Sequence, residues 1–167
     1  MINTILSPVD VLCKEHEVCS VKLTNLEKCL YDFKETKDID KLRTSFEEFY
    51  NYMKIGHKLH TLKEEILFKF MIKNLNFENT FINRLLDEHD TELLLLQDIT
   101  DIFLHITDFP DIRIDNDELI FLISEFISTL RKHFWDEEKH VFNFAKENLT
   151  DKDLEFISSK IKNIRFY

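Results

Sequence analysis

A histidine–glutamate pattern occurs twice in the chain at a spacing of 73 residues, and this internal repeat limits the folds that are open to it. The motif His-x-x-x-Glu-Glu begins at His60 and again at His133, and a Glu-His dipeptide recurs at the same spacing. Apolar positions keep the offset too, so that Leu23 corresponds to Leu96. Self-similarity of this length, with two helices in each unit, predicts two helical hairpins related by pseudo-symmetry.

The spacing inside each motif brings the histidine and the glutamate onto one helical face, because residues four apart are neighbours on a helix. From that position two side chains of one helix can reach the same metal ion or two adjacent ions. Packing the two hairpins together would gather six potential ligands around the bundle axis. These six are His16, His60, Glu64, His89, His133 and Glu137.

Four imidazoles and two carboxylates form a nitrogen and oxygen ligand set that suits iron, manganese or zinc. Two metal ions sharing the set would each receive two histidines, with Glu64 and Glu137 bridging between them. Such a centre keeps open positions for a small ligand such as O2, peroxide or NO. Burying these side chains without a metal would be costly, so a purely structural role is the weaker interpretation.

Composition favours an all-α fold. The 167 residues suit a single domain. A β-rich chain needs many turns, and a single glycine and two prolines supply few turn residues. The 16 phenylalanines can fill a long core. We predict an antiparallel up-and-down four-helix bundle over about residues 7–149 and a short fifth helix over about 150–165, in one domain of residues 1–167. The expected helices cover 8–33, 39–73, 80–107, 116–148 and 151–163, with a long loop through Asp115 before the fourth.

Two further histidines lie close to the motifs. His57 is one turn before the first motif and corresponds to a leucine in the repeat, which favours contact with the ligands over direct metal binding. His140 stands where the first half of the repeat has Leu67, two turns beyond His133. We therefore expect it on the same stripe as His133, either hydrogen-bonded near the site or reaching solvent. We expect the neighbouring acids to contact the ligands or solvent; they are Glu15, Glu65, Glu88 and Glu138.

Charge and cysteine content bear on partners and location. A formal charge of −10 argues against nucleic acid and anionic membranes, and no apolar stretch approaches the ~20 residues of a membrane span. Three cysteines and a polar start predict a cytoplasmic protein. We expect Cys13 and Cys19, on either side of His16, to be packing residues. A monomer and a dimer are both compatible with the acidic composition.

The motifs resemble the hemerythrin-like (HHE cation-binding) family of four-helix bundles with a non-haem di-iron centre. The resemblance covers about residues 7–149, in Glu15-His16, the two His-x-x-x-Glu-Glu motifs, Glu88-His89 and Val141-Phe142. It implies iron for the six ligands. It also implies a role in binding or reacting with O2, peroxide or NO, in oxidative or nitrosative stress or in iron homeostasis.

The chain departs from the O2-carrying members of that family. Those proteins have two histidines four apart on the third helix, whereas Leu85 and Leu93 stand four positions either side of His89. They also carry an aspartate five residues beyond the last histidine, where this chain has Glu137 at four. The chain is more similar to symmetric members associated with iron–sulfur cluster repair, NO and peroxide response and iron sensing. Turnover and an iron- or oxygen-sensing regulatory role without turnover are both open.

Overall fold

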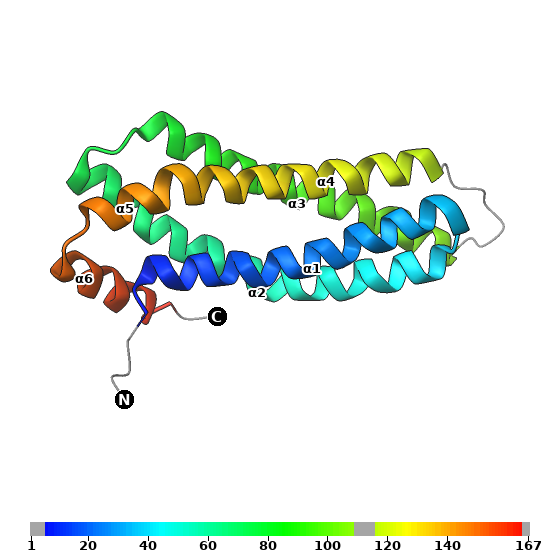
Figure 1. Ribbon diagram of the computed structural model, residues 1–167, viewed down its shortest axis with the longest axis horizontal. Helices are drawn as coiled ribbons and strands as arrows, with labels where there is room; N and C mark the ends of the chain where they lie inside the picture. Colours follow the sequence, from blue (N-terminus) through cyan, green and yellow to red (C-terminus); the bar gives the residue numbers. More distant parts are fainter. Residues whose placement is uncertain (1–5, 109–115, 165–167) are drawn as a thin grey trace.

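The computed structural model describes residues 6–108 and 116–164, and the prediction of an all-helical chain is confirmed. Four long helices lie side by side along the length of the molecule (Figure 1), and the described residues include no strand. The long helices are α1 (Pro8–Thr36), α2 (Ile39–Leu75), α3 (Asn79–Asp108) and α4 (Asn116–Asp136). Helix α1 packs against α2 and α4, and α3 also packs against both of these, so the four helices enclose one common core.

The helix ends follow from local capping chemistry. Ser7 caps α1, its hydroxyl accepting a hydrogen bond from the Asp10 N–H at 3.1 Å, and Pro8 occupies the first turn. The helix runs three residues past its predicted end at Phe33, because Lys37 adopts a left-handed conformation (φ 59°) and donates its N–H to the Phe33 carbonyl. Only Lys37 and Asp38 then separate α1 from α2. The predicted loop through Asp115 falls on residues 109–115, which lie outside the described residues.

The buried apolar residues form two clusters, one on each side of the histidine layer. The larger contains Leu23, Phe49 and Phe126, and the smaller contains Leu12 and Phe68. On α1, α2 and α3 the histidine of the repeat separates residues of one cluster from residues of the other, and beyond His133 the residues of the smaller cluster begin at Val141, after the end of α4. The polar layer is therefore closed off by hydrocarbon along the bundle axis in both directions.

The fourth helix differs from the single segment 116–148 that the sequence predicts. After Asp136 it continues as a π-helical turn, η1 (Glu137–Phe142), and then as α5 (Asn143–Asn148). A π turn accommodates one extra residue, so the apolar stripe beyond it is displaced by one position. The buried counterpart of Leu67 is accordingly Val141, 74 residues later, and not His140. The expectation that His140 shares the buried stripe is wrong.

His140 is exposed as a result. Its ring makes edge contacts with Phe81 and Trp135, both at 5.5 Å between centroids. The sequence leaves open whether His140 is hydrogen-bonded near the site or reaches solvent, and in the structure it reaches solvent.

A short helix, α6 (Asp151–Ile161), closes one end of the bundle and confirms the predicted fifth helix. Thr150 and Asp153 form a capping box, in which each residue accepts from the backbone N–H of the other. Ile157 is fully buried, and α6 contacts both α1 and α2. Within the described part of the chain, no helix is long and apolar enough to cross a membrane.

Candidate metal centre

The six predicted ligands meet in one buried layer across the middle of the bundle. His16 comes from α1, His89 from α3 and His133 from α4, while α2 supplies both His60 and Glu64. Glu137, the sixth, is the first residue of the π turn. All six are buried, and the two glutamates are fully inaccessible to solvent. Four separate helices therefore direct polar atoms toward one small volume.

These residues fall into two overlapping groups whose nitrogen and oxygen atoms all lie within 4.8 Å of one another. One group pairs His16 and His60 with the two glutamates, and the other pairs His89 and His133 with the same two glutamates. Each group could hold one metal ion. Because both groups share Glu64 and Glu137, the arrangement matches the bridging positions that the sequence predicts for them.

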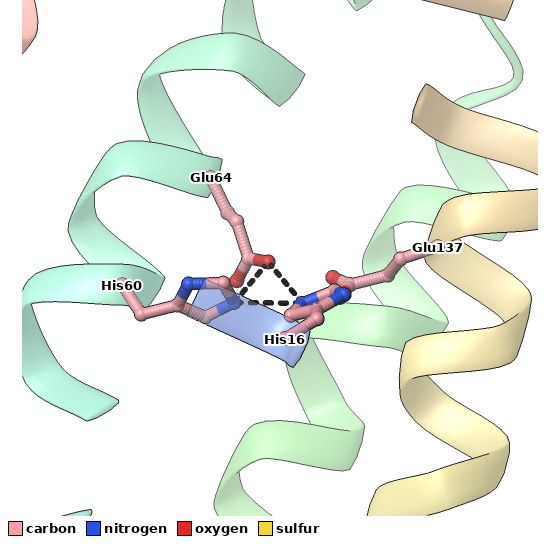
Figure 2. A group of neighbouring side chains, drawn as sticks. All are labelled: His16, His60, Glu64 and Glu137. Atoms are coloured by element: carbon pink, nitrogen blue, oxygen red, sulfur yellow. Dashed lines mark hydrogen bonds and ion pairs between the residues drawn. The ribbon is translucent and has the colours of Figure 1, made fainter. Parts of the chain in front are cut away.

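In the first group the atoms converge on a common point, as Figure 2 shows. The Nε2 atoms of His16 and His60 are 2.9 Å apart, and the Nε2 of His60 is 2.7 Å from Glu64 Oε1. Glu137 approaches from the other side, with Oε2 at 3.3 Å from His16 Nε2. Two imidazole nitrogens and two carboxylates thus surround one point from three helices.

The second group repeats this arrangement more loosely. His89 Nε2 lies 3.4 Å from Glu64 Oε2, and His133 Nε2 lies 3.2 Å from Glu137 Oε1. The two imidazole rings are 4.6 Å apart between centroids. Each bridging carboxylate therefore turns one oxygen toward each pair of histidines.

Hydrogen bonding tests whether a metal fits these residues. Both carboxylate oxygens of Glu64 and Glu137, and the Nε2 atoms of His89 and His133, are buried without a hydrogen-bond partner among the described residues. Even the 2.7 Å approach of His60 to Glu64 lacks the direction of a hydrogen bond. Buried polar atoms are seldom left unpaired, because doing so costs free energy. A cation at the centre of each group would satisfy all of them, so the residues fit a metal pair.

Outer carboxylates fix three of the four imidazoles by accepting hydrogen bonds at Nδ1, which leaves Nε2 facing the centre. This is the usual support for a metal-binding histidine. The Nδ1 to carboxylate distances are 2.9 Å for His60 with Glu15, 3.0 Å for His133 with Glu88 and 3.0 Å for His16 with Glu138. Of the two environments expected for these acids, the ligands or solvent, Glu15, Glu88 and Glu138 therefore have the contact with the ligands. Glu65 differs, since it pairs with Lys69, and His89 Nδ1 has no partner among the described residues.

Cations in turn hold two of these acids. Lys63 is paired with Glu15, and Arg84 is paired with Glu88. Glu15 and Glu88 occupy equivalent places in the repeat, and so do the histidines that they contact. The pseudo-symmetry of the sequence thus extends to two hydrogen bonds around the centre, that of Glu15 with His60 and that of Glu88 with His133.

The charges of the cluster shift its pKa values strongly. Burial by itself lowers the pKa of an imidazole, but the nearby carboxylates of Glu137, Glu138 and Glu64 outweigh it and raise the pKa of His16 to about 11. By the same balance of burial against carboxylates, the pKa of His133 rises to about 10 and that of His60 to about 9. The imidazolium neighbours hold the pKa of Glu64 well below its ordinary value despite its burial. Protons on these histidines therefore balance the charge of the buried carboxylates.

Sequence reasoning missed one buried acid beside the centre. Glu92 is 1% exposed, neither of its carboxylate oxygens has a hydrogen-bond partner among the described residues, and burial raises its pKa to about 7. Its Oε1 lies 3.8 Å from Nδ1 of His133. The signal was present in the periodicity, because Glu92 falls between His89 and Leu96 on the buried stripe of α3. The repeat comparison concealed it, since its counterpart is Cys19.

His57 lies beside the centre and belongs to neither ligand group. It is partly buried, and its ring meets that of His89 edge to face at 5.5 Å. Burial and the neighbouring His89 lower its pKa to about 4, so it is neutral near neutral pH. Cys19 is buried with its Sγ 3.8 Å from the Met53 sulfur, in agreement with a packing role.

Comparison with known proteins bears on this centre. The family model of the hemerythrin HHE cation binding domain matches residues 7–145. No curated protein and no solved structure matches the chain. The matched segment includes all six residues of the centre and the four long helices that carry them.

Proposed function

The chain belongs to the hemerythrin HHE cation-binding domain family, and we propose that its six buried histidines and glutamates hold two iron ions. The observation that carries the proposal is the pair of four-residue groups that share Glu64 and Glu137. Manganese and zinc are the substitutes that the same ligand set accepts. In this proposal the bundle is an antiparallel up-and-down one within a single domain.

A bound iron pair would supply electrons and open coordination positions, and so the capacity to bind or react with O2, peroxide or NO. The surrounding residues of the chain orient the ligands for such an iron pair. Glu15, Glu88 and Glu138 hold three imidazoles with Nε2 inward, and the bridging glutamates keep the two halves together. Phe134 stacks on His16 at 4.0 Å between ring centroids and excludes bulk water from that side.

We infer a role in the response to oxidative or nitrosative stress or in iron homeostasis, in the cytoplasm. The physiological ligand in this proposal is a diatomic molecule or peroxide, with neither nucleic acid nor membrane as partner. The acidic chain fits this, because a net charge of −10 repels both polyanions and anionic lipid surfaces.

A second function, an iron- or oxygen-sensing regulatory module without turnover, is favoured by one observation. The unpartnered oxygens of Glu64 and Glu137 lie between the two pairs of histidines, where one cation in each group would together join all four long helices. Metal binding and folding would then be strongly linked, and loss of the metal would loosen the bundle. A partner protein could recognise one of these two states of the bundle and not the other.

The test is the metal content of the purified protein, with optical spectra of the reduced form before and after exposure to air. We expect about two irons per chain and new charge-transfer bands on oxidation. His60→Ala and Glu137→Ala should each lower the iron content, whereas His140→Ala, at an exposed histidine outside the centre, should leave it unchanged. Absence of bound metal after anaerobic iron loading would refute the proposal. Consumption of peroxide or NO by the loaded protein favours the first function, and loss of helix on iron removal without turnover favours the second.

A further inference from the structure

A pocket of about 400 Å³ lies between α1 and α2 and opens onto one half of the centre. His16 and His60 form part of its wall, whereas His89 and His133 do not. Most of the remaining wall is apolar, and it includes Val11, Val18, Cys19, Tyr52, Met53 and Phe134. The pocket therefore distinguishes the two halves, which the sequence repeat makes nearly equivalent.

The single glycine of the chain contributes to this space. Gly56 lies in the interior of α2 and lines the pocket, although glycine is unfavourable inside a helix. No positive φ requires it, since the described residues include no glycine with φ above zero. A Cβ added there would meet only the Tyr52 ring, at 3.8 Å. The glycine thus serves neither the backbone nor a close helix contact, and its effect is to leave room in the pocket.

The size of this room is that of an organic ligand. Pockets that hold small molecules typically measure about 300–1,000 Å³, and a cavity of about 150 Å³ is enough for benzene. A diatomic gas needs far less than the 400 Å³ present. The apolar wall indicates a hydrocarbon body.

Charge at the rim indicates the other end of the ligand. Lys14 and Lys63 both line the pocket, and Lys14 is exposed. Glu15 is the acid among the lining residues, and it is already paired with Lys63 and His60. In a chain with a net charge of −10, this leaves a locally cationic rim above an apolar pocket.

We propose that the pocket between α1 and α2 binds a small aliphatic carboxylate, with its chain between the helices and its carboxylate at Lys14. Binding would bring the ligand against the imidazoles of His16 and His60. The proposal goes beyond the function inferred above, because the pocket is built from protein side chains and needs no metal to exist.

Isothermal titration calorimetry of the protein as purified tests this, with octanoate, acetate and octylammonium as probes. We expect octanoate to bind one molecule per chain, acetate to give no binding, and octylammonium to bind at least about tenfold more weakly than octanoate. Lys14→Ala should weaken octanoate about threefold, as for an exposed charge.

Gly56→Leu fills the pocket and should weaken octanoate by about tenfold or more, while leucine favours the helix. Asn51→Leu is the matched control, since it places the same side chain at an exposed position of the same helix away from the pocket. Equal affinity in wild-type protein and Gly56→Leu, or no heat with octanoate, would overturn the proposal. Metal content is measured on the same samples, so that failure of the pocket and failure of the metal centre are told apart.

Discussion

Filling the centre with metal should release protons, and the number can be worked out from the cluster. His16, His60 and His133 have pKa values of about 11, 9 and 10, so all three carry a proton at neutral pH in the metal-free protein. An imidazole must lose that proton to bind a metal through Nε2 while its Nδ1 stays bonded to a carboxylate. Loading both positions near pH 7.5 should therefore release about three protons per chain.

The same reasoning fixes how affinity depends on pH. When about three protons leave on binding, the product of the two metal association constants rises about a thousandfold per pH unit around neutrality. Raising the pH through the pKa range of the three histidines gradually removes this pH dependence of the affinity. At about pH 10, His60 is mostly neutral and His133 is half neutral, so the release falls to about 1.5 protons.

Titrating Zn²⁺ into metal-free protein in buffers of different ionisation enthalpy measures the proton number directly. Fe²⁺ under anaerobic conditions should give the same number, because the protons belong to the protein. His140→Ala serves as control and should not alter the count, since this histidine is exposed and outside both ligand groups. Release of no protons near pH 7.5 would show that the histidines are already neutral, and the charge balance described for the cluster would then be wrong.

Three further predictions concern single residues. The pKa of Glu92 is about 7 in the folded protein and 4.5 ordinarily. Below pH 4.5 Glu92 is protonated in both the folded and the unfolded state and does not affect stability. Above pH 7 its ionisation lowers the free energy of unfolding by about 3 kcal/mol. Glu92→Gln should therefore gain up to about 3 kcal/mol relative to wild type between pH 4.5 and pH 8, as measured by urea unfolding of metal-free protein; a gain independent of pH would contradict this. Glu88→Ala removes the acceptor from His133 and should lower metal affinity about 10- to 100-fold, whereas Glu65→Ala, at an acid that contacts Lys69 instead, should not. Gly56→Ala should raise stability by about 1 kcal/mol in thermal unfolding, since the added Cβ meets only an ordinary contact; a destabilised variant would mean that the helix needs glycine there.

Periodicity was sufficient to predict the long helices and the meeting of the six polar residues. Each histidine of the repeat falls between buried apolar residues on its helix, so burial and spacing carried the same information. The helix ends at Ser7 and Thr150 could be predicted as well, because capping depends on residues close in sequence. The predicted end at Phe33 was early, because the left-handed turn at Lys37 leaves little trace in composition.

The misplacement of His140 and the omission of Glu92 have different physical origins. A π turn changes the register of everything that follows it, and a fixed offset of 73 hides that change unless the apolar stripe is realigned. Glu92 was concealed because comparison of the two halves favours what they share. The periodicity of α3 alone would have indicated its burial, because Glu92 falls between His89 and Leu96 on the buried stripe.

The π turn that begins at Glu137 also determines how closely the two hairpins correspond to each other. The first hairpin carries His16, His60 and Glu64 on two uninterrupted helices, which is half of the ligand set. Removing Lys139 from the second would restore the 73-residue offset and align Val141 with Leu67. The ligands and the apolar stripe of the two halves would then keep one offset throughout. One residue in a helix thus separates the two halves in register, whereas the buried Cys19 and its counterpart Glu92 separate them in chemistry.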